Sequence, residues 1–290
     1  MTARTWTSLE LVKTTADYLA SRGLESPRLA AERLLAHALG CRRVDLYLAT
    51  ERRLDETVLR PYRALVRAYA AGQPLQYVVG ETEFMGLALH TDRRALIPRP
   101  ETEILVDAVE KRLRRDGAAA AAVLELGAGS GAVAVALAAR LPQVEVWSTE
   151  ISPRAAALAA ANARRHGVEE RVHFLVMDRF EALSPDLAGT MQCVVSNPPY
   201  VTTSEMQALP AVVREYEPSA ALHGGADGLD FHRYLCSRGL QFLAPGGTLA
   251  VEIGAAQGDA ARSLFAAAGL RDVTLLQDYA GRARVVLGTR

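Results

Sequence analysis

The chain has 290 residues, half of them in the hydrophobic class, and carries 33 basic and 33 acidic side chains. A disordered chain would combine low hydrophobicity with high net charge, so this composition indicates a folded protein with one large domain or two smaller ones. The zero net charge at pH 7 gives no whole-surface attraction to nucleic acid or to an anionic membrane.

The three cysteines lie far apart without a Cys-x-x-Cys pair, which argues against a disulfide framework and a thiolate zinc site. The six histidines form no H-x-x-H or H-x-x-x-H pair, so we predict no bound metal. The N-terminus lacks the apolar region of a signal peptide, and no run of about 18 apolar residues could span a bilayer. We therefore expect a cytoplasmic protein.

Apolar residues recur at helical spacing in the first part of the chain, as with Leu59 and Val66. We expect a helical domain over residues 1–72 and a β-hairpin linker over residues 73–100. Residues 1–80 hold 12 basic and 8 acidic side chains (+4), which leaves 21 against 25 (−4) for the remainder. This split fits either the solvated faces of helices or a surface that docks an acidic partner.

From residue 101 onward, apolar strands alternate with helices. A helix is expected over residues 101–115, and the strand candidates that follow are residues 122–126, 144–148, 172–177, 193–196 and 248–253. This alternation predicts an α/β domain over residues 101–290, with a mostly parallel sheet covered by helices on both faces. Residues 273–276 and 284–287 are separated by a short turn, which predicts an antiparallel last strand.

A glycine-rich turn, Gly127-Ala128-Gly129-Ser130-Gly131, follows the first strand of this domain. Glycines let the backbone approach a ligand closely, and the helix that follows offers free N–H groups at its N-terminus. With Ala132, the turn matches the dinucleotide pattern G-x-G-x-x-A. It also matches the tighter G-x-G-x-G pattern of S-adenosylmethionine sites, so both cofactor classes stay open at this point.

Acidic residues end the next two strands. Glu150 falls about 20 residues beyond the glycine turn, where an α/β fold of this class holds a carboxylate for ribose hydroxyls. Asp178 closes the third strand in the same way and could reach an adenine. A solvated surface carboxylate is the alternative at both positions.

The sequence Asn197-Pro198-Pro199-Tyr200 follows the fourth strand, at the carboxyl edge where ligands bind in open α/β sheets. Methyl transfer to a planar NH₂ group requires that this weakly nucleophilic nitrogen be held in line with the donor. The Asn197 side-chain carbonyl and the Pro198 main-chain carbonyl can accept its two hydrogens, and Tyr200 can cover the planar group. A simple Asn-Pro turn is the alternative reading.

With these motifs the sequence resembles the HemK/PrmC family of release factor glutamine methyltransferases. The segments that carry the resemblance are residues 74–80 (PLQYVVG), 96–103 (LIPRPETE), 125–131 (ELGAGSG), 197–200 (NPPY), 216–218 (YEP), 224–229 (GGADGL) and 278–282 (DYAGR). Asn-Pro-Pro-Tyr alone is shared with adenine-specific DNA methyltransferases, whereas the Pro-Arg-Pro-Glu-Thr-Glu segment singles out this family.

The resemblance implies a Rossmann-like methyltransferase fold, with S-adenosylmethionine as methyl donor and no metal. It implies methylation of the glutamine side-chain amide in the Gly-Gly-Gln motif of class I peptide chain release factors, with the helical domain recognising the substrate. It also implies that residues 99–103 line the cofactor pocket.

The cofactor contacts implied by the resemblance are the residues Gly127, Ala128, Gly129, Ser130, Gly131, Glu150, Asp178, Arg179 and Asn197. Those implied for the substrate glutamine are Asn197, Pro198, Pro199 and Tyr200, among which Asn197, Pro198 and Tyr200 are the catalytic candidates. The chain departs from the pattern where some members carry an aromatic residue after the acidic residue of the third strand. Here Arg179 holds that position and Phe180 comes next.

Three other functions compete with glutamine methylation. An adenine-specific DNA methyltransferase would have to extrude its base and hold phosphates, which the zero net charge and the short non-catalytic part disfavour. A nicotinamide-dependent oxidoreductase would leave Asn197-Pro198-Pro199-Tyr200 unexplained, and a catalytically silent binding module is the third. We expect a monomer that binds a protein substrate and no nucleic acid directly.

Overall fold

The structure, a computed structural model, describes residues 6–48, 53–115 and 121–290. The chain divides into two compact units. The first comprises Met1–Gly80 together with Ala211–Tyr216, and the second comprises Glu81–Pro210 and Glu217–Arg290. Within the described residues, no helix is long and apolar enough to cross a membrane.

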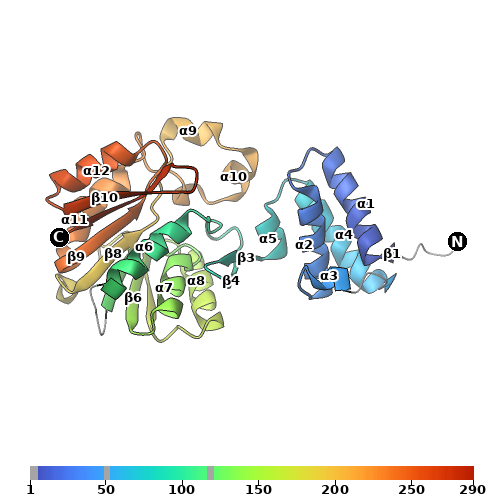
Figure 1. The fold of residues 1–290 in the computed structure, drawn as a ribbon, viewed down its shortest axis with the longest axis horizontal. Helices are drawn as coiled ribbons and strands as arrows, with labels where there is room; N and C mark the ends of the chain where they lie inside the picture. Colours follow the sequence, from blue (N-terminus) through green and yellow to red (C-terminus); the bar gives the residue numbers. More distant parts are fainter. Residues whose placement is uncertain (1–5, 49–52, 116–120) are drawn as a thin grey trace. The chain divides into compact units, whose positions relative to one another are not determined.

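The first unit is mainly helical (Figure 1). Its elements are β1 (Trp6–Thr7), α1 (Ser8–Ser21), α2 (Pro27–Leu39), α3 (Asp45–Leu48), β2 (Arg53–Leu54), α4 (Glu56–Ala70), α5 (Leu75–Val79) and α10 (Ala211–Tyr216). Strands β1 and β2 pair antiparallel. A capping box between Thr7 and Glu10 begins α1, because each residue's side chain accepts the other's backbone N–H. The helices enclose a core that includes Leu19, Leu34 and Tyr62.

The second unit is an α/β domain preceded by a hairpin of β3 (Glu81–Phe84) and β4 (Leu87–His90). Its strands are β5 (Ala121–Leu126), β6 (Val144–Glu150), β7 (Val172–Val176), β8 (Met191–Ser196), β9 (Leu243–Glu252), β10 (Arg271–Gln277) and β11 (Ala283–Thr289). Its helices are α6 (Thr102–Arg115), α7 (Ala132–Arg140), α8 (Pro153–Arg165), α9 (Thr203–Ala208), α11 (Asp230–Arg238) and α12 (Gly258–Ala267). Short 3₁₀ turns are η1 (Pro185–Leu187), η2 (Ser219–Ala221) and η3 (Gly239–Phe242).

The seven strands form one sheet in the order β10-β11-β9-β8-β5-β6-β7. Strands β9, β8, β5, β6 and β7 run parallel, which confirms the predicted mostly parallel sheet. The last strand, β11, is antiparallel to both of its neighbours, β9 and β10. It therefore lies inside the sheet, where the sequence indicated only that it forms a hairpin with the strand before it.

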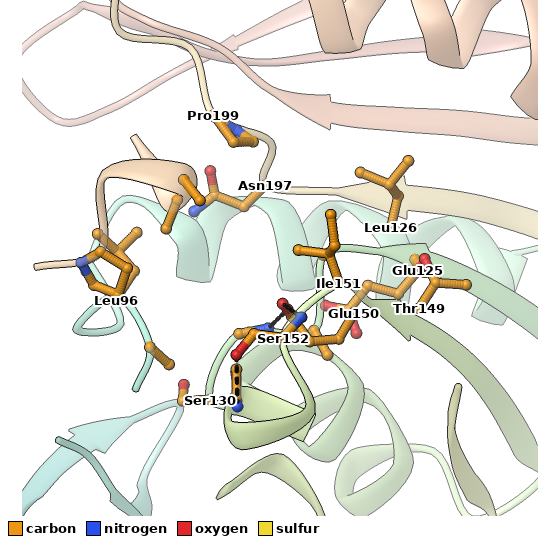
Figure 2. A pocket seen from close by; sticks show the side chains of 18 of the residues that line it. Leu96, Glu125, Leu126, Ser130, Thr149, Glu150, Ile151, Ser152, Asn197 and Pro199 are labelled. Atoms are coloured by element: carbon orange, nitrogen blue, oxygen red, sulfur yellow. Dashed lines mark hydrogen bonds between the residues drawn. The ribbon is translucent and has the colours of Figure 1, made fainter. Parts of the chain in front are cut away.

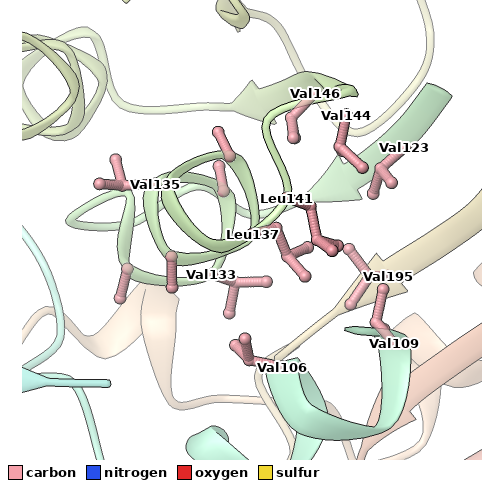
Figure 3. Close-up of a cluster of buried hydrophobic side chains, with 14 of the residues drawn as sticks. Val106, Val109, Val123, Val133, Val135, Leu137, Leu141, Val144, Val146 and Val195 are labelled. Atoms are coloured by element: carbon pink, nitrogen blue, oxygen red, sulfur yellow. The ribbon is translucent and has the colours of Figure 1, made fainter. Parts of the chain in front are cut away.

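Both faces of the sheet are buried, as the apolar strands predicted. Neighbouring residues of one strand enter opposite cores: Val195 packs with helices α6 and α7, whereas Val194 packs with α11 and α12. Figure 3 shows the first of these cores, where Leu137 and Leu141 of the α7 region lie close to the strand valines. The rigid sheet between the two cores fixes the positions of the loops at its carboxyl edge.

Candidate cofactor and substrate site

A cavity of about 400 Å³ opens where the parallel strands of the second unit end. It is lined by the glycine turn after β5, the end of β6 and the loops after β7 and β8, and residues 94–98 and 218–221 complete its walls. Figure 2 shows side chains from these separate segments, among them Leu96, Glu150 and Asn197, arranged around it. The loops that the sequence placed at one sheet edge therefore meet in a single pocket.

The glycine turn is one wall of this cavity. Gly127, Gly129 and Gly131 have φ angles of 85°, 55° and 81°, the left-handed region that favours glycine. A Cβ at Gly131 would lie 3.0 Å from the Cβ of Ala159, so a side chain there would press against α8. All three glycines are thus required by the backbone conformation of the turn, and the last of them is also required by its close packing against α8. Gly127, Ala128, Gly129 and Ser130 line the cavity, whereas Gly131 is not among its lining residues.

Glu150 is buried at the end of β6, with 9% of its surface exposed. Its two carboxylate oxygens accept the backbone N–H groups of Gly129 and Ser152, each at 2.9 Å (Figure 2). These charge-assisted bonds fix the carboxylate between the glycine turn and the start of α8. Ile151, the next residue, is 61% exposed and also lines the cavity.

Glu125 is a second buried acid at this edge and lines the cavity from β5. Burial raises the pKa of Glu125 to about 8; the hydrogen bond donated by Ser148 opposes this shift, and the nearby Glu150 carboxylate adds to it. With that pKa, Glu125 is mostly protonated at pH 7 and adds little negative charge beside Glu150.

Asp178 and Arg179 follow β7 and both line the cavity. The Arg179 guanidinium is already engaged, since its Nε donates to Asp178 at 3.1 Å and it lies 4.8 Å from the ring centroid of Tyr234. Phe180 is buried and packs edge-on against Phe242. Phe180 is therefore not among the lining residues of the cavity, and Arg179, which lines it, is held by Asp178 and Tyr234.

Hydrophobic side chains from other segments supply the apolar surface. Ile151, Met177 and Phe231 all line the cavity. Phe231, in the first turn of α11, is the aromatic residue of this wall. It lies far along the chain from Asp178, and no local pattern marked it.

Asn197 and Pro199 face the cavity from the loop after β8, whereas Pro198 and Tyr200 are not among its lining residues. The Asn197 side chain donates from Nδ2 to the Thr102 Oγ1, 3.0 Å away. Its Oδ1 makes no hydrogen bond to any described residue and can accept one from a ligand. The Tyr200 hydroxyl donates to Glu252 at 3.4 Å, and burial raises the pKa of Tyr200.

The Asn-Pro-Pro-Tyr loop rests against the glycine-containing segment 224–229. A Cβ at Gly224 would lie 2.6 Å from the Pro199 carbonyl oxygen, and one at Gly228 would lie 2.2 Å from that of Tyr200. The Gln257 side chain donates to the carbonyl of Tyr200 at 3.1 Å and to that of Gly228 at 3.2 Å. The glycines thus allow two backbones to touch, and Gln257 ties them together.

Only Thr102 of residues 99–103 reaches the cavity, although the resemblance implied the whole segment. Arg99 instead forms an ion pair with the buried Glu217. Among the described residues, no three His, Cys, Asp or Glu side chains are grouped so that they could hold a metal ion.

Two family models match the chain. The PrmC N-terminal domain matches residues 10–80, and the methyltransferase small domain matches residues 100–217. A release factor glutamine methyltransferase of Geobacter sulfurreducens is 44% identical over 98% of this chain and 96% of its own length. One from Moorella thermoacetica is 42% identical over 94% of both chains.

The chain belongs to the release factor glutamine methyltransferase family. The resemblance drawn from the motifs is thereby confirmed. Among solved structures, a methyltransferase from Pyrococcus furiosus is 18% identical, with a TM-score of 0.51 over 80% of this chain and 98% of that one. That likeness bears on the fold alone, and it agrees with the methyltransferase fold of this family.

Proposed function

We propose that the protein transfers a methyl group from S-adenosylmethionine to the side-chain amide nitrogen of the glutamine in the Gly-Gly-Gln motif of class I peptide chain release factors. The observation that carries this proposal is the orientation of Asn197. Its NH₂ group is held by Thr102, which leaves its carbonyl oxygen at the cavity as a hydrogen-bond acceptor. An acceptor there suits a substrate amide, which offers two N–H donors.

The cavity fits the cofactor in its size and in the placement of its polar groups. Glu150 can accept hydrogen bonds from ribose hydroxyls, and the glycine turn allows close backbone approach to the ligand. Ile151, Met177 and Phe231 supply an apolar surface for an adenine, with Asp178 and Arg179 at its edge. When bound, S-adenosylmethionine supplies a methyl group on a positively charged sulfur.

The chain's own residues orient the amide. The Oδ1 of Asn197 and the main-chain carbonyl of Pro198 accept the two N–H hydrogens, which holds the nitrogen in one orientation toward the donor. Pro199 lines the same wall. Tyr200, anchored through Glu252, covers the planar amide in this proposal. Positioning of this kind can supply up to about 7–11 kcal/mol of the barrier without a covalent nucleophile.

The first unit, which lies outside the catalytic fold, is proposed to recognise the protein substrate. Val44, Tyr47 and Leu48 of this unit are exposed apolar residues that a protein partner could cover. We further propose that the enzyme acts as a monomer. We also propose that it binds no nucleic acid directly, in keeping with its zero net charge.

Two measurements test this function. Calorimetry is expected to show binding of S-adenosylmethionine and its demethylated product but not of NADH; tight NADH binding alone would support an oxidoreductase instead. Methyl transfer is then followed with a purified release factor and, in parallel, with duplex DNA. Transfer to the protein alone supports the proposal, whereas transfer to DNA alone supports an adenine methyltransferase.

A further inference from the structure

Two buried polar side chains lie next to the Asn-Pro-Pro-Tyr loop, and each accepts a hydrogen bond from one of its functional residues. Thr102, the first residue of α6, is 3% exposed, and Glu252, the last residue of β9, is 1% exposed. Asn197 donates to Thr102 at 3.0 Å, and Tyr200 donates to Glu252 at 3.4 Å. The hydroxyl of Thr102 also interacts with the Glu252 carboxyl group and favours its charged form.

The number of protons on these side chains determines which of them donates each hydrogen bond and which accepts it. A threonine hydroxyl carries one proton, and because its oxygen accepts from Asn197, that proton is free for another acceptor. The Glu252 carboxyl group interacts with this hydroxyl, and in its ionised form the carboxylate can only accept a hydrogen bond. With Glu252 ionised, the hydrogens therefore point from Asn197 through Thr102 toward Glu252.

This direction decides which atom Asn197 presents to a ligand. An asparagine amide rotated by half a turn exchanges its oxygen and nitrogen with little change in shape. In the rotated state Asn197 would meet a substrate NH₂ group with another NH₂ group, donor against donor. Only an acceptor at the Thr102 position holds the productive orientation.

We propose that Thr102 and Glu252 are positioning residues that keep the Asn197 Oδ1 turned toward the substrate amide. The inference rests on the proposed function and deepens it, because it assigns the orientation of the central acceptor to two residues outside the Asn-Pro-Pro-Tyr loop. Neither residue needs to touch the reacting atoms.

The buried carboxyl group of Glu252 is unfavourable for the stability of the fold, which supports a functional role for this residue. Its Oε2 has no hydrogen-bond partner among the described residues, and burial raises the pKa of Glu252 to about 7. A buried and incompletely paired carboxyl group destabilises a fold compared with an apolar residue of similar size. His232, also buried, holds the backbone at this point through a contact of 3.1 Å between Nε2 and the Glu252 carbonyl.

The matched pair Thr102→Val and Thr102→Ser tests the proposal. Valine keeps the shape of threonine without the hydroxyl, and serine keeps the hydroxyl without the methyl group. With a release factor as methyl acceptor, we expect Thr102→Val to lower kcat between tenfold and a hundredfold, and Thr102→Ser to stay within about threefold of the parent. Cofactor affinity by calorimetry should change less than threefold in both. Equal activities of the two variants, whether high or low, would overturn the proposal.

A double-variant cycle tests whether Glu252 acts through Thr102. Glu252→Met removes the acceptor and keeps an apolar side chain of similar length. If Glu252 acts through Thr102, the two substitutions are not independent. The fold-loss in activity of the double variant Thr102→Val/Glu252→Met is then clearly smaller than the two single fold-losses multiplied together. Multiplicative losses would show independent effects and contradict this link.

A readout without a methyl acceptor separates this inference from the proposed function. The Asn197 side-chain NH₂ signals in NMR, assigned by their absence in Asn197→Ala, should be protected from hydrogen exchange in the parent and in Thr102→Ser, and unprotected in Thr102→Val. If the parent fails to methylate a release factor but shows this pattern, the proposed function fails and the inference stands. If the parent is active and Thr102→Val retains both protection and kcat, the inference alone fails.

Discussion

One guanidinium nitrogen of Arg99 contacts both carboxylate oxygens of Glu217, at 2.6 and 2.7 Å. The Glu217 side chain is only 2% exposed, whereas a third of the Arg99 side chain reaches solvent. The two residues adjoin separate walls of the cavity, since Pro98 and Pro218 both line it. The ion pair therefore joins two segments that shape the candidate cofactor pocket.

Removal of one partner of this pair is expected to be costly. Arg99→Met leaves the Glu217 carboxylate buried and unpaired, which should lower the free energy of unfolding by about 3 kcal/mol. Chemical denaturation measures this loss. The double variant Arg99→Met/Glu217→Gln should recover part of it, because it removes the stranded charge; a double variant at least as unstable as Arg99→Met would contradict this account.

Glu150 should control cofactor affinity. Glu150→Ala removes the proposed ribose acceptor and releases the N–H groups of Gly129 and Ser152, so the Kd for S-adenosylmethionine should rise at least tenfold, about 1.4 kcal/mol. Calorimetry gives the affinity. Glu145→Ala is the matched control, because Glu145 lies on the same strand but is exposed and pairs with His173. Equal affinity losses in both variants would reject the role of Glu150.

Gly228 should be needed for its lack of a side chain as well as for its backbone conformation. Gly228 and Gly246 have φ angles of 74° and 78°, so alanine costs about 1–2 kcal/mol at either position. Only at Gly228 would the new Cβ meet the Tyr200 carbonyl oxygen, since nothing lies within 4 Å of it at Gly246. We expect similar backbone strain from the positive φ angle in both variants, but a loss of methyl transfer only in Gly228→Ala. Full activity of Gly228→Ala would show that the loop can move aside.

Glu125 should make stability dependent on pH. Its pKa is raised from the usual 4.5 to about 8 in the folded protein, so the folded state binds its proton more tightly than the unfolded state. The resulting stabilisation is fully present below pH 4.5 and is lost as the pH rises through 8, at about 1.4 kcal/mol for each pKa unit. The stability of Glu125→Gln relative to the parent should therefore increase from pH 4.5 to pH 8 in denaturation measurements. A difference independent of pH would contradict the shift.

The sequence predicted the sheet well because buried parallel strands read as continuous apolar runs. The position of β11 inside the sheet depends on its pairing with β9, a contact between distant segments that a local pattern does not encode. The hairpin turn before β11 indicated its direction, and direction is the part of the prediction that the structure confirms.

In the candidate site, too, the sequence predicted the features that depend on local patterns and missed the contacts between distant segments. The sequence placed Asn197 and Glu150 at one sheet edge because both follow strands, and both line the cavity. The contact between Asn197 and Thr102 joins residues 95 positions apart, so no spacing rule could find it. Phe231 was not predicted for the same reason, because it lies far along the chain from Asp178, which lines the same cavity. The roles assigned to the site residues and to the separate parts of the chain stay predictions until variants are measured.

The most direct test of the central claim is tandem mass spectrometry of a class I release factor after incubation with the enzyme and S-adenosylmethionine. The account predicts one added methyl group on the side-chain nitrogen of the glutamine in the Gly-Gly-Gln motif, and its loss with Asn197→Ala. A methyl group found at another residue of the release factor, or an unmodified release factor beside methylated adenine in duplex DNA, would contradict it.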